Sequence, residues 1–407
     1  VFAANSSEAT TPFLAGYVDT GIPWQAWSQA TLDKAAASNR PVLVVIGYST
    51  CPFSRRLRTH SLQDPALTSF LKNNFVCMLV DADDNASLAN LVLDFQPVLG
   101  SPPSYPAMLW VLPTGKPYHI HKFATKSGFT PEGIMESATK ALKIWQSKDG
   151  YAAMLGEDTL ARLAPLEKID KQRPPMTPEI VFDRAYTVIN QFFDITHGSV
   201  SSGKNFPSAC QLKMALRLAE VFPEDSFRRK QLRQIVGTCL AKMRDGAIRD
   251  ALDGTFHQYS EKPNWNGPHS EKSLVDQAMI ASAYLDAARH LQDESFRATA
   301  FALLDTVLAN WKTSSGLFRH AETAFVGEDW IGPSPFIAPW FTWSLGEINQ
   351  LLDPEEAKIL IHCHGIMSRG NMPPSLYMPE FKDRANVLYS ASSPAETASA
   401  LALPPAV

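Results

Sequence analysis

Buried-strand patterns are confined to the first 146 residues of this 407-residue chain. The runs PVLVVIGYS (41–49) and FVCMLVDAD (75–83) are short and rich in β-branched residues, as buried strands are. The stretch 107–123 predicts two further strands, and helical spacing follows each of the first two runs. A capped amphipathic helix is expected over 130–145. This order of strands and helices predicts an α/β sandwich over residues 1–146, including an N-terminal extension.

A proline-rich segment ends this region. Residues 147–177 carry mixed charge and finish in DKQRPPMTP, where consecutive prolines exclude helix and favour an extended linker. Beyond it, strand patterns nearly vanish, and loops rich in Gly, Pro and aromatic residues separate the helical patterns. We expect an all-α partial toroid of helical hairpins over 178–390, followed by an Ala/Pro-rich tail over 391–407. Its helices are predicted at 178–194, 208–222, 226–245, 270–291, 294–313 and 344–361.

The composition excludes several classes of protein. A hydrophobic fraction of 45% and a net charge of -4 are typical of a soluble globular protein, and give no reason to expect nucleic acid or an anionic membrane as partner. No apolar run approaches the roughly 18 residues that a transmembrane helix needs. The five cysteines show no repeated Cys-x-x-Cys, which argues against a structural zinc site. The small, polar start VFAANSSEATTP favours an extracytoplasmic protein whose signal peptide has been removed.

Several longer stretches match a known family. In the first region they are PFLAGYVDTGIPWQAW (12–27), RPVLVVIGYSTCPFS (40–54) and YPAMLWVLPTGKP (105–117), and in the second DGTFHQYSEKPNWNGPHSEKSLVDQA (253–278). SGLFRHAE, FTWSLGEINQLL and RANVLY extend the match. The chain resembles the spermatogenesis-associated protein 20 family and its bacterial relatives over nearly its whole length. The resemblance implies a thioredoxin-like domain followed by an (α/α) toroid similar to that of N-acylglucosamine 2-epimerases and six-hairpin glycosidases.

The chain also departs from the pattern of that family. Ser54 stands where the family usually has the second cysteine of its thioredoxin-like motif. An acidic stretch of the toroid appears here as ETAFVGEDW (322–330), with most of its carboxylates missing. Because family members continue well beyond RANVLY, about half of the toroid is expected to be absent. The apolar helix faces left open would then be covered by a protein partner or by a homo-oligomer.

Cys51 is the candidate nucleophile of the first domain. It precedes a helix start with Pro52 at the first helical position, where unpaired N–H groups stabilise a thiolate. The resemblance places a cis-proline, Pro106, against this cysteine. Without a thiol at Ser54, Cys51 can form a mixed disulfide but cannot release itself by the dithiol route. Monothiol chemistry and an inert, structural role both stay open.

The stretch 253–278 holds the densest polar and aromatic cluster of the chain. Aromatic rings that stack on a sugar, with a His and a carboxylate for proton transfer, are what an isomerase or glycosidase pocket requires. The candidate ligand-binding residues are His257, Tyr259, Trp265, His269 and Glu271. The resemblance implies that they face the centre of the ring, with His269 and Glu271 foremost. Catalysis, ligand binding without chemistry and a purely architectural role all stay open.

Neighbouring charged residues have simpler interpretations. Asp250 and Asp253 suit either the second carboxylate of a glycosidase or the capping of turns. Lys272 and Asp276, four residues apart on a predicted helix, indicate an ordinary surface ion pair.

Together these patterns favour a non-catalytic binding or scaffolding subunit that recognises a protein partner or a glycan. The first alternative is a monothiol redox protein using Cys51, and the second is a sugar isomerase or hydrolase at His269 and Glu271. Dithiol oxidoreduction is disfavoured by Ser54. No metal or cofactor is expected, since the run His362-Cys363-His364 has no third group of ligands beside it.

Overall fold

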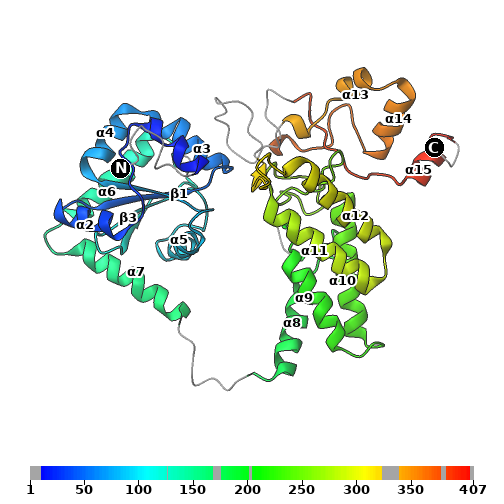
Figure 1. The fold of residues 1–407 in the computed structure, drawn as a ribbon, viewed down its shortest axis with the longest axis horizontal. Helices are drawn as coiled ribbons and strands as arrows, with labels where there is room; N and C mark the ends of the chain where they lie inside the picture. The colour runs from blue at the N-terminus through cyan, green and yellow to red at the C-terminus, as the bar shows by residue number, and fades with distance from the viewer. Residues whose placement is uncertain are drawn as a thin grey trace. The chain divides into compact units, whose positions relative to one another are not determined.

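The chain forms two compact units, each described here by itself (Figure 1). The computed structural model describes residues 11–125, 127–167, 176–200, 204–322, 339–376 and 382–403. The units divide between Arg173 and Pro174, inside the segment 147–177 expected as a linker. Much of that segment is folded, however, because Tyr151–Glu167 form helix α7 of the first unit. The paired prolines lie outside the described residues.

A four-stranded mixed sheet is the centre of the first unit. Its strands are β1 (Val42–Gly47), β2 (Val76–Asp81), β3 (Ala107–Val111) and β4 (Pro117–Ile120), in the order β2-β1-β3-β4. β1 is parallel to β2 and antiparallel to β3, and β3 and β4 form the hairpin predicted over 107–123. Every residue of β1 and β2 is buried, which explains why both strands read as continuous apolar runs in the sequence.

Helices cover both faces of this sheet. Alternate residues of β1 enter two separate cores, with Leu43 and Val45 in one and Val44 and Ile46 in the other. The first core is covered by α1 (Pro12–Gly16), α3 (Pro52–Thr59), α4 (Pro65–Asn74) and α6 (Pro131–Trp145). The second is covered by α2 (Gln29–Ala37) and α5 (Ala86–Val98), and α7 runs beside β4. The α/β architecture expected from the sequence is confirmed.

The second unit is mainly helical. Five helices share one core: α8 (Pro178–Phe192), α9 (Ala209–Val221), α10 (Phe227–Asp245), α11 (Leu274–Leu291) and α12 (Glu294–Thr306), the last continued by a π-helical turn at Val307–Trp311. Figure 1 shows α9 to α12 packed side by side. Their positions agree with the predicted helices to within a few residues. A helical second unit is therefore confirmed, and its closure into a partial toroid stays a prediction.

Three shorter helices are also described in this unit: α13 (Leu345–Leu351), α14 (Pro354–Cys363) and α15 (Pro394–Ala400). The single helix predicted over 344–361 is wrong, because Asp353 and Pro354 start a new helix within it. Each begins with a full capping box, which satisfies N–H groups at the helix start that have no partner within the helix. α15 lies in the expected Ala/Pro-rich tail, where the Thr397 hydroxyl lies 3.2 Å from both the Cys363 sulfur and the His362 ring. Among the described residues, no helix combines the length and apolarity that crossing a bilayer requires.

Candidate functional sites

Cys51 caps the start of α3, as its sequence context predicts. Its backbone is extended and Pro52 follows as the first helical residue, as at a typical helix start. The Ser54 N–H donates to the Cys51 sulfur at 3.4 Å. The Tyr105 carbonyl oxygen lies 3.9 Å from the same sulfur, and the Tyr105-Pro106 peptide bond is cis. The structure therefore brings Cys51, Ser54 and Pro106 together.

This thiol site is closed to solvent. Cys51 is 2% exposed and Ser54 is 1% exposed. The Ser54 hydroxyl has no hydrogen-bond partner among the described residues, and a Cβ atom at Gly47 would lie 2.3 Å from its Oγ. Burial, with Cys51 close by, raises the pKa of Tyr17, whose hydroxyl donates to the Ser54 carbonyl at 2.9 Å. Ser54 thus fills a small space and offers no second sulfur to Cys51.

Two of the nearby arginines have partners of their own. The Arg56 guanidinium lies 5.0 Å from the centre of the Phe129 ring, and Arg58 donates to the Gly16 carbonyl at 3.0 Å. Both contacts tie α3 to its neighbours. Arg56 and Arg58, which follow Cys51 in the sequence, therefore have a packing role.

The aromatic cluster of the second unit is packed together rather than open. Tyr259 and His269 stack with ring centres 4.5 Å apart, and the Lys204 ammonium lies 4.9 Å from the Tyr259 ring. Burial, and then the charge of Lys204, lowers the pKa of His269 to about 4. Glu271 is buried, and its carbonyl oxygen accepts from the Gln258 N–H at 2.9 Å. His269 and Glu271, the two residues that the sequence favoured most for a ligand site, are thus buried within the loop that carries them.

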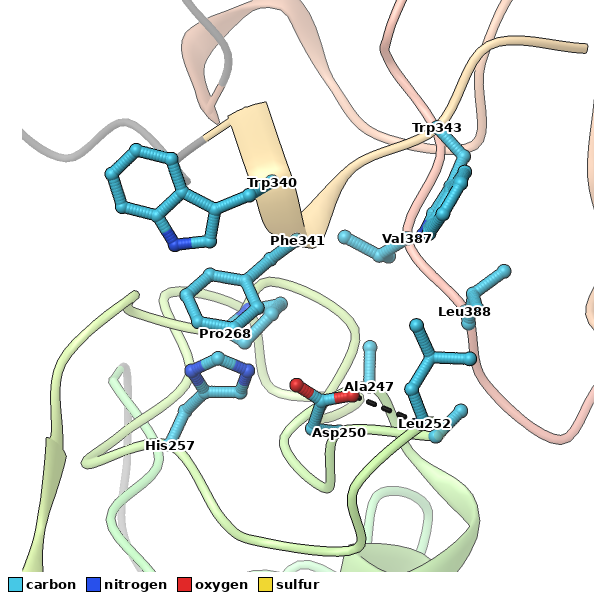
Figure 2. A pocket seen from close by; sticks show the side chains of 11 residues that line it. Ala247, Asp250, Leu252, His257, Pro268, Trp340, Phe341, Trp343, Val387 and Leu388 are labelled. Atoms are coloured by element: carbon cyan, nitrogen blue, oxygen red, sulfur yellow. Dashed lines mark hydrogen bonds between the residues drawn. The ribbon is translucent and has the colours of Figure 1, made fainter. Parts of the chain in front are cut away.

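His257 borders a small pocket in this unit. Figure 2 shows its imidazole below the Phe341 ring, at a centre-to-centre distance of 4.7 Å, with Asp250 on the same side of the pocket. The cavity measures about 30 Å³, which is room for about one water molecule. Burial, and then the charge of Lys272, lowers the pKa of His257. Within the described residues this pocket is far smaller than a sugar ring requires, and a packing role is favoured for His257.

Trp265 has a structural position. It is buried, adopts a left-handed backbone with φ of 64°, and its indole N–H donates to the His197 carbonyl at 3.0 Å. The ring is therefore unavailable for stacking on a ligand. Its role is to fix the turn that carries His197.

Lys272 is the residue that sequence reasoning missed. It is fully buried in β5 (Lys272–Ser273), which pairs with β6 (Ala321–Glu322). Its ammonium lies 2.8 Å from an Asp250 oxygen, 3.0 Å from an Asp253 oxygen and 4.8 Å from the centre of the Phe341 ring. The predicted Lys272–Asp276 pair is wrong, because Asp276 instead accepts from the Ser273 hydroxyl at the start of α11. The only sequence signal was the pair of aspartates about twenty residues upstream.

Asp250 and Asp253 both cap turns, which is one of the two roles considered for them, and both also bind Lys272. Asp250 accepts from the Leu252 N–H and Asp253 from the Thr255 N–H, so each caps a turn. Their remaining oxygens bind Lys272. Burial raises the pKa of Glu322 in the neighbouring strand, an effect that Lys272 opposes. The carboxylates are therefore committed to a buried ion cluster.

None of the five cysteines forms a disulfide, and the described residues contain no group of three or more His, Cys, Asp or Glu able to hold a metal ion. His119 is a half-buried residue of β4, and the buried His121 directly follows that strand. Burial lowers the pKa of both, that of His119 to about 4.

Comparison with known proteins gives the chain a context. Residues 4–163 match a family model named Thioredox_DsbH and described as "Protein of unknown function, DUF255". Human spermatogenesis-associated protein 20 is 27% identical over 381 residues, which cover 90% of this chain and 48% of the human protein. An uncharacterised protein of Caenorhabditis elegans is 26% identical over 283 residues, covering 68% of this chain and 37% of its own length. The chain thus spans about half the length of the human relative and less of the nematode one.

A solved structure also matches the chain. The disulphide isomerase from Xylella fastidiosa Temecula1 is 18% identical, with a TM-score of 0.20, and the match covers 36% of this chain and 98% of that one. The family model and the curated relatives carry the conclusion. The chain has a thioredoxin-like domain at its N-terminal end and resembles the spermatogenesis-associated protein 20 family over most of its length.

Proposed function

We propose that this chain is a thioredoxin-like binding protein that recognises a protein surface and does not perform dithiol exchange. The observation that carries the proposal is the closed thiol site. Cys51 is almost fully buried, and the position that would hold the resolving thiol is a buried serine. Dithiol exchange needs an accessible thiolate and a second thiol beside it, and neither requirement is met.

An apolar stripe on α8 supports a binding role for the second unit. Val181, Val188 and Phe192 are spaced seven and four residues apart and are between 42 and 52% exposed. Another side of α8 packs into the core through Phe182 and Ile189. A helix with apolar residues outside its core-facing side fits a helix–helix contact with another molecule. We propose a second copy of the chain as that molecule, because two antiparallel α8 helices would bring the same residues together across a two-fold axis.

The mass of the native chain in solution tests this proposal. Light scattering after size exclusion should give a dimer, and Val188→Asp should convert it to a monomer. Val275→Asp is the matched control, because Val275 is 71% exposed on α11 and lies outside the stripe. A wild-type chain that stays monomeric at high micromolar concentration would refute self-association, as would loss of the dimer in both variants.

A monothiol redox protein is the second candidate. The favouring observation is the N–H of Ser54 pointing at the Cys51 sulfur, since helix-start donors stabilise a thiolate. Iodoacetamide labelling followed by peptide mapping decides between the candidates, with exposed Cys210 as the reference thiol in the same molecule. The binding proposal predicts that at pH 6 Cys51 is labelled more slowly than Cys210 and reacts only on unfolding. Faster labelling of Cys51 would instead establish the monothiol candidate.

A further inference from the structure

A groove lined by both polar and apolar residues lies between two loops of the second unit. It has a volume of about 570 Å³, within the usual range of sites for small molecules. One wall is formed by Lys262, Asn264 and Asn266, and the other by residues between 367 and 373 together with Tyr389. His197 also lines the groove. No carboxylate is among the described residues that line it.

His197 is held firmly at this groove. Its Nδ1 lies 2.6 Å from an Asp194 oxygen, and the other Asp194 oxygen accepts the N–H groups of Thr196 and His197. The Trp265 indole N–H donates a hydrogen bond to the His197 carbonyl oxygen. Because a carboxylate only accepts, Nδ1 donates to Asp194, and Nε2 is the ring nitrogen left for a ligand. The Asp194 charge is thereby satisfied by donors of its own turn.

The asparagines of the groove present donors. The Asn264 side-chain oxygen accepts the Asn266 N–H at 3.2 Å, and the Asn266 side-chain oxygen accepts the Ala247 N–H at 3.1 Å. Since a backbone N–H must meet the oxygen of an amide, both NH₂ groups are left for a ligand. Asn371 differs, because its oxygen accepts from Val387 and its NH₂ donates to the Gly365 and Val387 carbonyls. Asn371 therefore stabilises the wall of the groove and has no donor left for a ligand.

In the described part of the chain, the positive charge of Lys262 at the groove has no acidic partner. Among the described residues, no carboxylate lies within ion-pair distance of Lys262, whereas its neighbour Glu261 is paired with Lys204 at 2.8 Å. The Lys262 ammonium, two amide NH₂ groups and the Tyr389 hydroxyl can all donate. A ligand that satisfies them must be rich in acceptors, and hydrogen bonds to a charged oxygen are the stronger kind. We propose that this groove binds a small organic anion through its carboxylate or phosphate group, with His197 accepting or donating at a neighbouring hydroxyl.

Calorimetric titration of the full chain tests the proposal with four compounds on one six-carbon scaffold. They are 6-phosphogluconate, gluconate, glucose 6-phosphate and glucose. At least one anion should bind with a stoichiometry of one and at least about ten-fold more tightly than glucose, because hydrogen bonds to charged groups carry that much affinity. Comparison of gluconate with glucose 6-phosphate tells a carboxylate site from a phosphate site. Absence of such a preference for any anion overturns the proposal.

Two variants test whether the anion binds in the groove. Lys262→Met should weaken binding about ten-fold, with Lys230→Met, on the exposed side of α10, as the matched control. Asn264→Asp replaces a donor with a negative charge and should weaken binding at least as much, whereas Asn73→Asp on α4 should not. Lys262 and Asn264 lie at the surface, so both variants are expected to fold, as an unchanged circular dichroism spectrum would verify. Equal weakening by a variant and its control would overturn the assignment.

Discussion

Replacing Lys272 by Met should destabilise the second unit, because it leaves two carboxylates facing a position without charge. The Lys272 side chain has no exposed surface and contacts oxygens of Asp250 and Asp253 at 2.8 and 3.0 Å. Removing one partner of a buried ion pair costs about 3–5 kcal/mol of unfolding free energy. Here the aspartate side chains keep 13 and 32% of their surface exposed, and each retains a backbone N–H donor. We therefore expect a loss of about 2–4 kcal/mol.

The loss should be largely recovered when the carboxylates are neutralised as well. The triple variant Lys272→Met, Asp250→Asn, Asp253→Asn carries no charge in the cluster and should lie within about 1–2 kcal/mol of the wild type, since a buried ion pair gains little over neutral groups of similar shape. Lys358→Met is the surface control. Its pair with Glu355 spans 2.7 Å with both side chains more than 60% exposed, so it should cost at most about 0.5 kcal/mol.

Hydrogen exchange measured along a urea series gives the unfolding free energy of each unit separately, which a single optical transition of a two-unit chain does not. Peptides from α11 report on the second unit and peptides from β1 on the first. The reasoning about Lys272 is refuted if Lys272→Met lowers the stability of α11 by less than about 1 kcal/mol. It is also refuted if the triple variant is less stable than the single one.

Three further predictions concern other sites. Ser54→Cys should allow a disulfide between Cys51 and the introduced cysteine in the oxidised chain, detected as protection of both thiols from alkylation after unfolding without reductant, and labelling of both thiols in that unfolded, oxidised sample would contradict this. Gly198→Ala should lower the free energy of unfolding, measured by thermal unfolding, by at least about 1 kcal/mol more than Gly316→Ala does. Both glycines have a positive φ, but only at Gly198 would a Cβ atom meet a backbone oxygen, 2.9 Å away. Burial holds the pKa of His269 near 4, below its usual value of 6.5, so the unfolded chain binds the extra proton and the second unit should lose stability as pH falls from 6.5 to 4. His269→Gln should flatten that pH dependence, and an unchanged slope would count against it.

The sequence by itself determined the local elements and the architecture of the first unit. The continuous apolar runs at 42–47 and 76–81 predicted strands that are buried on both faces, and the structure has β1 and β2 there. The Cys51-Pro52 step predicted a capped helix start, because both signals act within one turn. The five longer helices of the second unit were equally visible, since an amphipathic period depends only on neighbours a few residues away.

Only the tertiary structure decided the roles of the charged and aromatic residues. Lys272 was expected to pair with Asp276 on the strength of a spacing of four, yet it binds Asp250 and Asp253 through a loop that folds back on it. Trp265 and His269 carried the sequence signature of a ligand site, but Trp265 proved to be packed against the turn at His197 and His269 against Tyr259 of its own loop. Periodicity is a local property, whereas burial and charge pairing depend on contacts between residues far apart in the chain. The open groove beside His197 follows from such contacts and left no recognisable pattern in the sequence.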